Sequence, residues 1–323
     1  MILFGTVPKT EHFEQVINAG DIRWSLPKVV YHLEDLRVDM SYPNYYISRL
    51  ASKFVKVCLQ GIGGDELFGG YPWRYYRVFD LISQQDFFKQ YYGFWQRLVP
   101  DKDKKDIFVS GVFNQIDLNE PREIFDRIFK FNPLLKYDRP EDHIQNSLYF
   151  EVKTFLNGLL IMGDKLSMAN GLEERFPFLD NDLVNFTQKI PVKHKLGNLT
   201  NKIERINENE TKNKKTLSYE KYDDGKNVLR QAMKELIPKT IINRQKQGFS
   251  APDESWYLGE NAKYVKELLL RNNTASSNYI NPDYIKKIID EHINNHINHR
   301  LLIWSFLSFE WWCKIFLNSR KIE

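Results

Sequence analysis

The pattern of apolar and polar positions predicts an early α/β part. Residues 54–59 are a short, mostly apolar run with two β-branched valines, which predicts a strand. A helical pattern precedes it over residues 44–53. Residues 10–19 predict another helix, with Phe13 and Val16 among the inward-facing positions. Helix, strand and helix in this order are typical of a parallel sheet.

Later in the chain, apolar positions recur mainly at spacings of three and four, as on a helix. Residues 73–98 carry aromatic side chains at these spacings and predict one long helix, whose aromatic residues we interpret as core packing. Residues 99–143 contain four prolines and predict short helices joined by loops. Residues 148–171 predict a second long helix that ends at Gly171. Further helices are expected at residues 227–237, 261–270, 282–294 and 301–316.

Composition narrows the class of protein. The 323 residues are 42% hydrophobic and 27% charged, which is ordinary for a soluble globular protein. A net charge of +4 is too small to predict binding to nucleic acid or to an acidic membrane surface. Cys58 and Cys313 lie far apart and predict neither a metal site nor a disulfide framework. The stretch at 301–317 is too short and too polar to span a membrane, and a cytoplasmic location is expected.

A glycine-rich turn follows the predicted strand. Residues 60–71 read Gln-Gly-Ile-Gly-Gly-Asp-Glu-Leu-Phe-Gly-Gly-Tyr. Glycines allow a sharp turn and a close approach to a ligand, and N–H groups at a helix start bind phosphate. A carboxylate beside bound phosphate suits Mg²⁺. These residues therefore predict a nucleotide or pyrophosphate site, or else a tight strand-to-helix turn in which Asp65 only stabilises the helix start.

The turn closely resembles the pyrophosphate loop in the synthetase domain of glutamine-dependent asparagine synthetases. Three later blocks extend this resemblance in the same order and at similar spacing. Residues 162–180 resemble the family's Asp-Arg/Lys-x-Ser-Met-Ala…Glu-x-Arg-x-Pro-Phe-Leu-Asp block. Residues 226–238 resemble its Lys-x-x-Leu-Arg…Leu-Pro segment, and residues 244–256 its Arg-x-Lys-x-Gly-Phe…Pro…Trp loop. The resemblance covers roughly residues 10–318.

The resemblance implies an α/β fold with a parallel sheet of the adenine-nucleotide α-hydrolase type, truncated at its N-terminus, and a large helical C-terminal part. One synthetase domain is expected over residues 1–318, with a polar insertion near 198–226 and a tail at 319–323. The implied reaction activates the side-chain carboxylate of aspartate with ATP and Mg²⁺, forming β-aspartyl-AMP and pyrophosphate. Ammonia from glutamine then gives asparagine. A homodimer is left open as the assembly.

Specific phosphate and metal contacts follow from the resemblance. Asp65 is the expected Mg²⁺ ligand, because a divalent ion offsets the charge of departing pyrophosphate. Lys246 is expected to stabilise charge on the transferring phosphoryl and adenylate groups, with a solvated surface charge as its alternative. The expected contacts to ATP and pyrophosphate are Gln60, Gly61, Gly63, Gly64, Asp65 and Lys246.

Three further acidic positions receive expected roles. Glu66 is expected to orient the aspartate amine or support the metal, and a structural carboxylate stays open. Asp164 is expected to bind the substrate ammonium group, with an ion pair to Lys165 or a neighbour as the alternative. Glu173 and Arg175 are expected to form a structural charge network near the site.

Histidines near the C-terminus raise a separate question. His292, His296 and His299 recur at spacings that one helix could turn into a metal site. Apart from Glu291, no carboxylate or cysteine pattern supports such a site. Capping or solvent-facing roles are the favoured interpretation.

The chain also departs from the family pattern. Gln60 replaces the usual serine but can still donate hydrogen bonds, while Ile62 replaces a glutamate that some members use in the second half-reaction. The glutaminase domain and the family's other phosphate loop, Ser-Gly-Gly-x-Asp-Ser, are missing. We therefore expect a C-terminal fragment or split subunit that is inactive or severely impaired without an N-terminal partner chain. A relative with another carboxylate acceptor, of β-lactam or peptide-cyclising type, and a non-catalytic assembly subunit are the alternatives.

Overall fold

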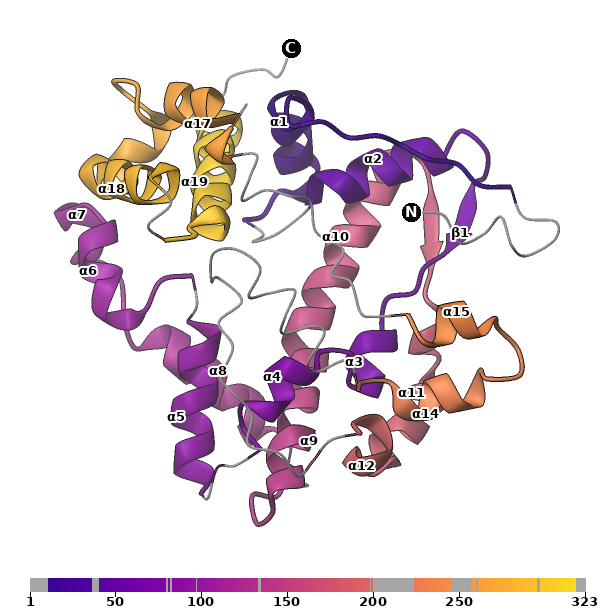
Figure 1. The fold of residues 1–323 in the computed structure, drawn as a ribbon. Coiled ribbons are helices and arrows are strands. Elements are labelled where there is room, and N and C mark those ends of the chain that lie inside the picture. The colour runs from indigo at the N-terminus through magenta and orange to yellow at the C-terminus, as the bar shows by residue number, and fades with distance from the viewer. Residues whose placement is uncertain are drawn as a thin grey trace.

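A computed structural model describes most of the chain as packed helices with one small sheet (Figure 1). The expectation for Lys246, most of the polar insertion and the tail lie outside the described residues. The description covers residues 11–36, 41–79, 81, 83–96, 98–132, 135–197, 199, 224–244, 257–259, 261–294 and 297–317.

The first half of the chain alternates short and medium helices around a single strand. Its elements are α1 (Asp21–Leu33), α2 (Ser41–Ala51), β1 (Val57–Leu59), α3 (Gly64–Phe68), α4 (Pro72–Tyr76), α5 (Gln84–Trp95), η2 (Asp101–Asp103), α6 (Lys104–Ile107), α7 (Ser110–Phe113), α8 (Glu120–Lys130) and α9 (Pro140–Glu151).

The second half contains the other strand and the C-terminal helices. Its elements are η3 (Val152–Leu156), α10 (Asn157–Met168), β2 (Glu173–Arg175), η4 (Pro177–Leu179), α11 (Asn181–Lys189), α12 (Val192–Lys195), α14 (Asn227–Ala232), α15 (Lys239–Ile242), α17 (Asn261–Leu269), η5 (Ala275–Asn278), α18 (Pro282–Ile293), α19 (Arg300–Trp312) and η6 (Cys313–Leu317).

Within the described residues, the sheet consists of β1 and β2 in parallel, with Cys58 opposite Glu174. The α/β class is confirmed in this coarse form. Because the strands are parallel, their carboxyl ends meet at one edge, and the glycine turn leaves β1 at that edge. Side chains alternate between faces in a strand, so Cys58 is half-buried while Val57 and Leu59 are exposed.

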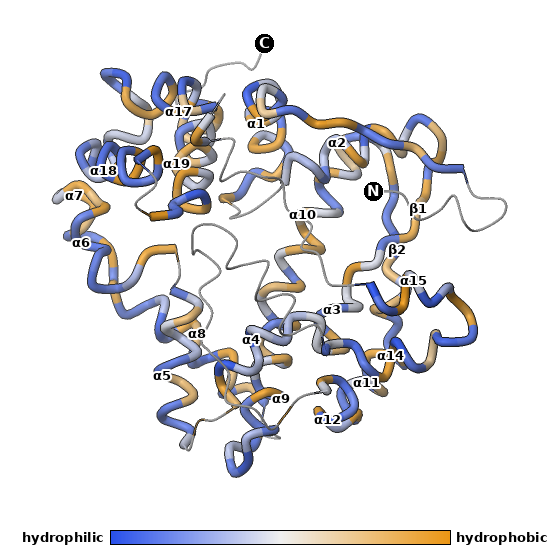
Figure 2. The backbone as a smooth tube through the Cα atoms, in the orientation of Figure 1, coloured by the Kyte–Doolittle hydropathy of each residue, from blue (hydrophilic) through white to orange (hydrophobic). Residues whose placement is uncertain are grey.

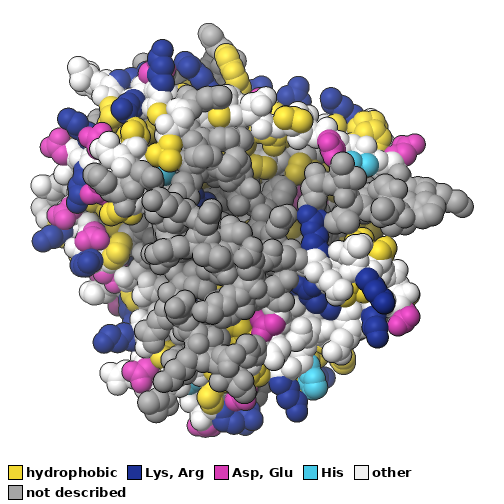
Figure 3. All heavy atoms as spheres, viewed as in Figure 1, with side chains coloured by type: hydrophobic (Ala, Val, Ile, Leu, Met, Phe, Trp, Pro, Cys, Tyr) yellow, Lys and Arg dark blue, Asp and Glu magenta, His cyan; other side chains and the backbone are white. Residues whose placement is uncertain are grey.

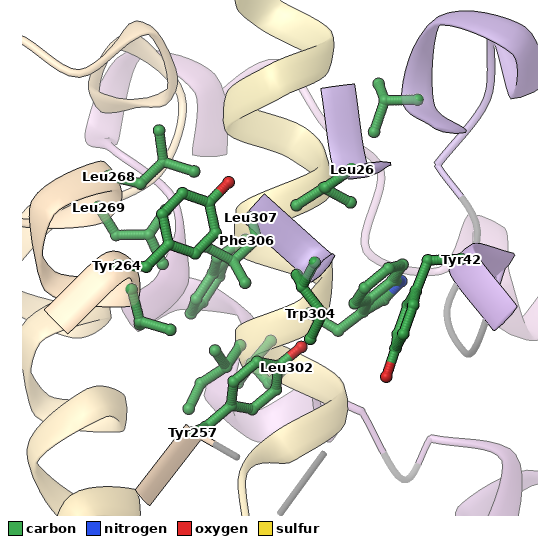
Figure 4. Packing of buried hydrophobic residues seen from close by; sticks show 14 of the residues in the cluster. Leu26, Tyr42, Tyr257, Tyr264, Leu268, Leu269, Leu302, Trp304, Phe306 and Leu307 are labelled. Carbon is green, nitrogen blue, oxygen red and sulfur yellow. The ribbon is translucent and has the colours of Figure 1, made fainter. Parts of the chain in front are cut away.

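A large apolar cluster joins the two ends of the described chain. Helices α1, α2, α17, α18 and α19 contribute to it, and we call it the C-terminal cluster. Figure 4 shows Tyr42 facing Trp304, and their ring centroids are 5.6 Å apart. Hydrophobic stretches on α10 and α19 are visible in Figure 2. This packing brings α1, near the start of the described chain, against α19, near its end.

A second cluster is aromatic and lies among α5, α8 and α9. Phe87, Tyr91 and Phe150 are buried there together with Phe125 and Phe129. The interpretation of the aromatic residues in 73–98 as core packing is therefore confirmed. Bulky rings fill space efficiently, since each buries a large apolar area.

Two helix predictions were wrong, one in the existence of the helix and one in its extent. Residues 11–18 form no helix, and Phe13 and Val16 are exposed; Phe13 instead packs its ring on Phe54 at a centroid distance of 3.9 Å. The predicted helix over residues 73–98 is broken into α4 and α5. Its aromatic spacing continues through the break, but Ser83 caps α5 by accepting the Asp86 N–H at 3.1 Å, which starts a new helix.

Other helix predictions were confirmed. The prediction for residues 148–171 corresponds to the end of α9, the π-helical turn η3 and α10, and Gly171 follows with a positive φ of 65°. Short helices do occur between residues 99 and 143, and α17, α18 and α19 match their expected positions. Helix α14 is shorter than predicted, since it ends at Ala232.

The surface agrees with the small net charge. Basic and acidic side chains are interspersed around the left rim of the face shown in Figure 3. None of the described helices has both the length and the apolar character that crossing a membrane requires.

Candidate functional site

The candidate site is built on the turn at the carboxyl end of β1. The Gln60 N–H donates to the Arg175 carbonyl at 2.8 Å, which extends the strand pairing by one residue. Gly63 then adopts a φ of 97°, a left-handed conformation that favours glycine. A Cβ at this position would also lie 2.5 Å from Leu179 Cδ2. Both conformation and space therefore require glycine where the chain turns into α3.

Glu66 ties the two ends of this turn together. Its Oε2 accepts the Gly63 N–H at 3.1 Å, and its Oε1 accepts the Tyr71 hydroxyl at 2.7 Å. The Glu66 residue is only 2% exposed. Burial raises the pKa of Tyr71 well above its usual range, and the neighbouring Glu66 carboxylate adds to this. Glu66 as a direct substrate ligand stays a prediction.

Asp65, the residue before Glu66, meets a lysine from a distant segment of the chain. Its Oδ1 lies 2.8 Å from Lys226 Nζ, with the Asp65 side chain 18% exposed. Lys226 has a positive φ of 61°, which is rare for a non-glycine residue and marks a strained, often functional position. Its N–H donates to the Phe68 carbonyl at 3.1 Å. The ion pair therefore joins the glycine turn to the segment before α14.

Glycines allow these two segments to touch. A Cβ on Gly70 would lie 1.8 Å from Asp65 Oδ1, and a Cβ on Gly225 would lie 2.3 Å from the Gly69 carbonyl oxygen. Side chains at either position would push the ion pair or the backbone apart. The close approach of the two segments therefore requires glycine at both Gly70 and Gly225.

A second group of polar side chains lies beside the turn. Gln60 Nε2 donates to Glu174 Oε1 at 2.9 Å. Burial raises the pKa of Glu174, and the negative charge of Asp164 raises it further. A Cβ on Gly163 would lie 2.7 Å from Glu174 Oε2, so α10 also approaches β2 closely at a glycine. The structure thus brings Gln60 and Asp164 near one another through Glu174.

The alternative partner suggested for Asp164 is used elsewhere. Lys165 Nζ lies 2.9 Å from Glu34 Oε2 and donates to the Leu33 carbonyl at 2.7 Å. This places Lys165 against the end of α1. Asp164 is exposed on α10.

Glu173 and Arg175 lie on the opposite face of β2 from Glu174. Arg175 Nη2 is 2.6 Å from Glu173 Oε1, and both side chains are more than half exposed. They form a charge pair with each other, while their expected role in a structural charge network near the site stays a prediction. The alternation of the strand separates this pair from the polar group around Gln60.

The predicted cation Lys246 lies outside the described residues, but the start of its loop is placed. Arg230 donates through Nε to the Gly225 carbonyl at 3.1 Å and through its terminal nitrogens to the carbonyls of Ile242 and Arg244. Arg244 opens the matched loop. One arginine therefore holds the start of this loop to the segment that carries Lys226.

The donor set suits Mg²⁺ only in combination with phosphate. Among the described residues, no group of three potential His, Cys, Asp or Glu ligands is gathered. Asp65 offers one carboxylate beside the glycine turn and already holds a cation, the Lys226 ammonium group. One carboxylate plus phosphate oxygens is a set that Mg²⁺ commonly accepts. Asp65 therefore fits the expected role when phosphate is bound.

Among the described histidines, His292 lies on α18 and His299 does not, because α18 ends at Ile293. His292 Nδ1 accepts the His299 N–H at 3.1 Å, and His299 Nε2 lies 2.7 Å from Glu291 Oε2. His292 is buried and helps to cap the turn, which agrees with the capping interpretation. His296 lies outside the described residues.

Sequence reasoning missed three members of the site. Lys226 opens the matched Lys-x-x-Leu-Arg segment, and this position was the available signal. Tyr71 closes the glycine signature. Glu174 carried no signal, because a run of two glutamates does not indicate which one faces inward.

Comparison with known proteins gives this site a context. The sequence model of a family described as asparagine synthase matches residues 7–314. The chain is 28% identical to asparagine synthetase (glutamine-hydrolyzing) 1 of Bacillus subtilis over 96% of its own length and 48% of that protein. It is 25% identical to asparagine synthetase (glutamine-hydrolyzing) 3 of the same bacterium over 80% of its length and 37% of that protein. Amidase chyE of Penicillium rubens is 25% identical over 73% of the chain and 38% of the amidase. The chain spans about half the length, or less, of these curated relatives.

Proposed function

The chain belongs to the asparagine synthase family, and from this premise we propose that it forms the synthetase part of an ATP-dependent amidating enzyme. The observation that carries the proposal is the glycine turn at the carboxyl end of β1, where Asp65 meets Lys226 at 2.8 Å. Ligands of open α/β sheets bind outside the carboxyl ends of strands. We take aspartate as the acceptor, β-aspartyl-AMP as the intermediate and ammonia from glutamine as the nucleophile.

The phosphate side of the proposed reaction uses the turn itself. Gln60, Gly61, Gly63 and Gly64 are proposed to lie along ATP and pyrophosphate. Asp65 would hold Mg²⁺, which when bound offsets charge on the departing pyrophosphate. Lys226 then becomes available as a fixed cation beside Asp65, and Lys246 is proposed as a second one.

The acceptor side uses the polar group next to the turn. Asp164 is proposed to bind the amino group of aspartate, and Glu174 is proposed to increase the negative potential there. Burial and the Asp164 charge raise the pKa of Glu174, so its charged form is costly without a partner, and a bound cation would offset that cost. An ammonium group is such a cation.

The sheet supports a larger architecture than two strands. Parallel sheets are normally covered on both faces. Val57 and Leu59 are 48% and 74% exposed on β1. We propose that these strands belong to an adenine-nucleotide α-hydrolase-type sheet, within one domain over residues 1–318, which an N-terminal glutaminase and phosphate-loop chain completes. A homodimer and a cytoplasmic location are also proposals.

Pyrophosphate release tests the proposed reaction. The chain is assayed with ATP, Mg²⁺ and a panel of carboxylic acids, alone and with the N-terminal half of the Bacillus subtilis relative. We expect release with aspartate only when both halves are present, and loss of at least 100-fold in Asp65→Ala. Asp182→Ala, a carboxylate at the start of α11, is the control.

The outcomes separate the candidates. Pyrophosphate release only with another acid would reject aspartate as the acceptor. The second candidate function is therefore a synthetase with a different carboxylate acceptor, since an amidase is among the similar proteins. Full activity of the chain alone would reject the partner requirement. Activity retained in Asp65→Ala would remove Asp65 from its metal role.

A further inference from the structure

A charged pair is buried beneath the glycine turn. Arg74 in α4 has a side chain only 7% exposed, and its Nη1 lies 3.6 Å from Oε2 of the fully buried Glu151. Burial alone lowers the pKa of Arg74, but the Glu151 carboxylate opposes this and the net direction is upward. Buried ion pairs add little net stability, whereas losing one partner is strongly destabilising. Such a pair is therefore better explained by what it positions than by stability.

Glu151 is held from several directions. Tyr75 donates its hydroxyl to Glu151 Oε2 at 3.1 Å, and the Tyr91 hydroxyl lies 3.5 Å from Oε1. Glu151 is the last residue of α9, directly before the π-helical turn η3. Single π-helical turns inside α-helices occur frequently at functional sites. The carboxylate is thus a fixed point in the longest helical segment of the described chain.

Arg74 links Glu151 to Tyr71, the last residue of the glycine turn. Its guanidinium carbon lies 4.2 Å from the ring centroid of Tyr71 and 4.5 Å from that of Phe155. The rings of Tyr71 and Phe155 meet edge to face at 5.8 Å. A guanidinium over aromatic faces is attracted to them, more strongly where water is excluded. The ring of Tyr71 is therefore held in one place.

Two hydrogen bonds to Glu66 connect Tyr71 to the backbone of the turn. Tyr71 donates to Glu66, and Glu66 accepts the Gly63 N–H, so both carboxylate oxygens of Glu66 face protein groups. We propose that Arg74 and Glu151 act through Tyr71 and Glu66 to fix the glycine turn in its binding conformation. Glu66 is accordingly a positioning residue. The inference rests on the proposed function only in taking this turn as the pyrophosphate loop.

Hydrogen–deuterium exchange of the turn tests the proposal without any need for activity. Tyr71→Phe removes the hydroxyl but keeps the ring over Arg74. We expect amide exchange in residues 60–70 to become about tenfold faster, because a buried hydrogen bond to a charged group is lost. Tyr264→Phe is the matched control, since Tyr264 accepts a hydrogen bond from Trp311 Nε1 at 2.9 Å in the C-terminal cluster. It should leave exchange in the turn unchanged.

Glu66 gives a graded version of the same test. Glu66→Ala should loosen the turn as much as Tyr71→Phe or more. Glu66→Gln should give an intermediate exchange rate, because its amide oxygen can still accept the Gly63 N–H. In a second arm, inorganic pyrophosphate with Mg²⁺ should slow exchange of the turn, and Tyr71→Phe should need about tenfold more pyrophosphate for the same protection.

Each outcome decides between the proposals. Unchanged exchange in Tyr71→Phe and Glu66→Ala would overturn the positioning role, as would equal loosening by Tyr264→Phe. Faster exchange in the turn with no pyrophosphate protection in any variant would uphold the positioning role and count against the proposed function. Rescue by Glu66→Gln with restored protection would support both.

Discussion

The C-terminal cluster and the layer beneath the glycine turn use buried charge differently. In the C-terminal cluster, Glu310 pairs with Lys314 four residues on, at 2.9 Å, and also accepts the N–H groups of Ala275 and Ser276 at 3.1 and 2.8 Å, so its carboxylate satisfies a helix start. Beneath the turn, Arg74 and Glu151 are buried among aromatic rings and lead to a loop. The first region uses polar groups to finish its helices. The second uses them to hold a conformation that apolar packing alone would not specify.

The largest effect is expected from breaking the buried ion pair. Glu151→Ala leaves the Arg74 charge without its partner and should lower the free energy of unfolding by about 3–5 kcal/mol. Leu307→Ala in the C-terminal cluster should lower it by about 2–5 kcal/mol, because Leu307 is fully buried. Urea unfolding measures both. Only Glu151→Ala should also speed amide exchange in the turn, and equal effects there would remove the distinction between the two regions.

A smaller effect is expected from pH. Lys195 backs the end of the turn, with its Cβ 3.6 Å from the position of a Cβ on Gly69. Burial lowers the pKa of Lys195 from 10.5 to about 8. The unfolded chain therefore binds more protons above pH 8, and the free energy of unfolding rises with pH until the unfolded pKa is reached.

Lys195→Met should remove this dependence. Between pH 7.5 and 9.5 we expect the wild-type chain to gain about 2 kcal/mol relative to the variant, measured by urea unfolding at each pH. Lys193→Met changes an exposed lysine on the same helix and should keep the wild-type slope. Parallel profiles for wild-type and Lys195→Met would contradict the burial argument.

The smallest effect is expected at the rim of the C-terminal cluster. Arg23 Nη1 lies 3.6 Å from Glu267 Oε2, and both side chains are about half exposed. Arg23→Ala should change the free energy of unfolding by less than about 1 kcal/mol, because solvent screens the pair. Adding salt to the wild-type chain should have a comparably small effect. A decrease in the free energy of unfolding as large as that of Glu151→Ala would show that solvent exposure does not predict how much an ion pair stabilises this protein.

Local features were predictable from the sequence because their cause is local. The glycine turn after β1 follows from residue type at Gly63, whose left-handed backbone disfavours other residues. The C-terminal helices follow from their apolar spacing. The break between α4 and α5 was missed, because aromatic residues continue at helical spacing while Ser83 begins a new helix.

Contacts between distant segments could not be predicted from spacing. Asp65 and Lys226 meet because Gly70 and Gly225 leave room for two backbones, and no periodic pattern encodes that meeting. The inward direction of Glu174, rather than Glu173, depends on strand register, which the pairing with β1 sets. The candidate loop was thus predictable, while the side chains that surround it required the fold.

The π-helical turn η3 has a consequence for rotational phase. An α-helix advances about 100° per residue, so the one extra residue of a π-helical turn rotates everything after it by roughly that amount. Before η3 the helix directs Glu151 toward Arg74, and after it Gly163 and Asp164 are presented to Glu174. One continuous helical segment thereby contacts Arg74 on one side of its axis and Glu174 on another. Deleting a single residue in η3 would leave the segment helical, but it would rotate α10, with Gly163 and Asp164, away from Glu174.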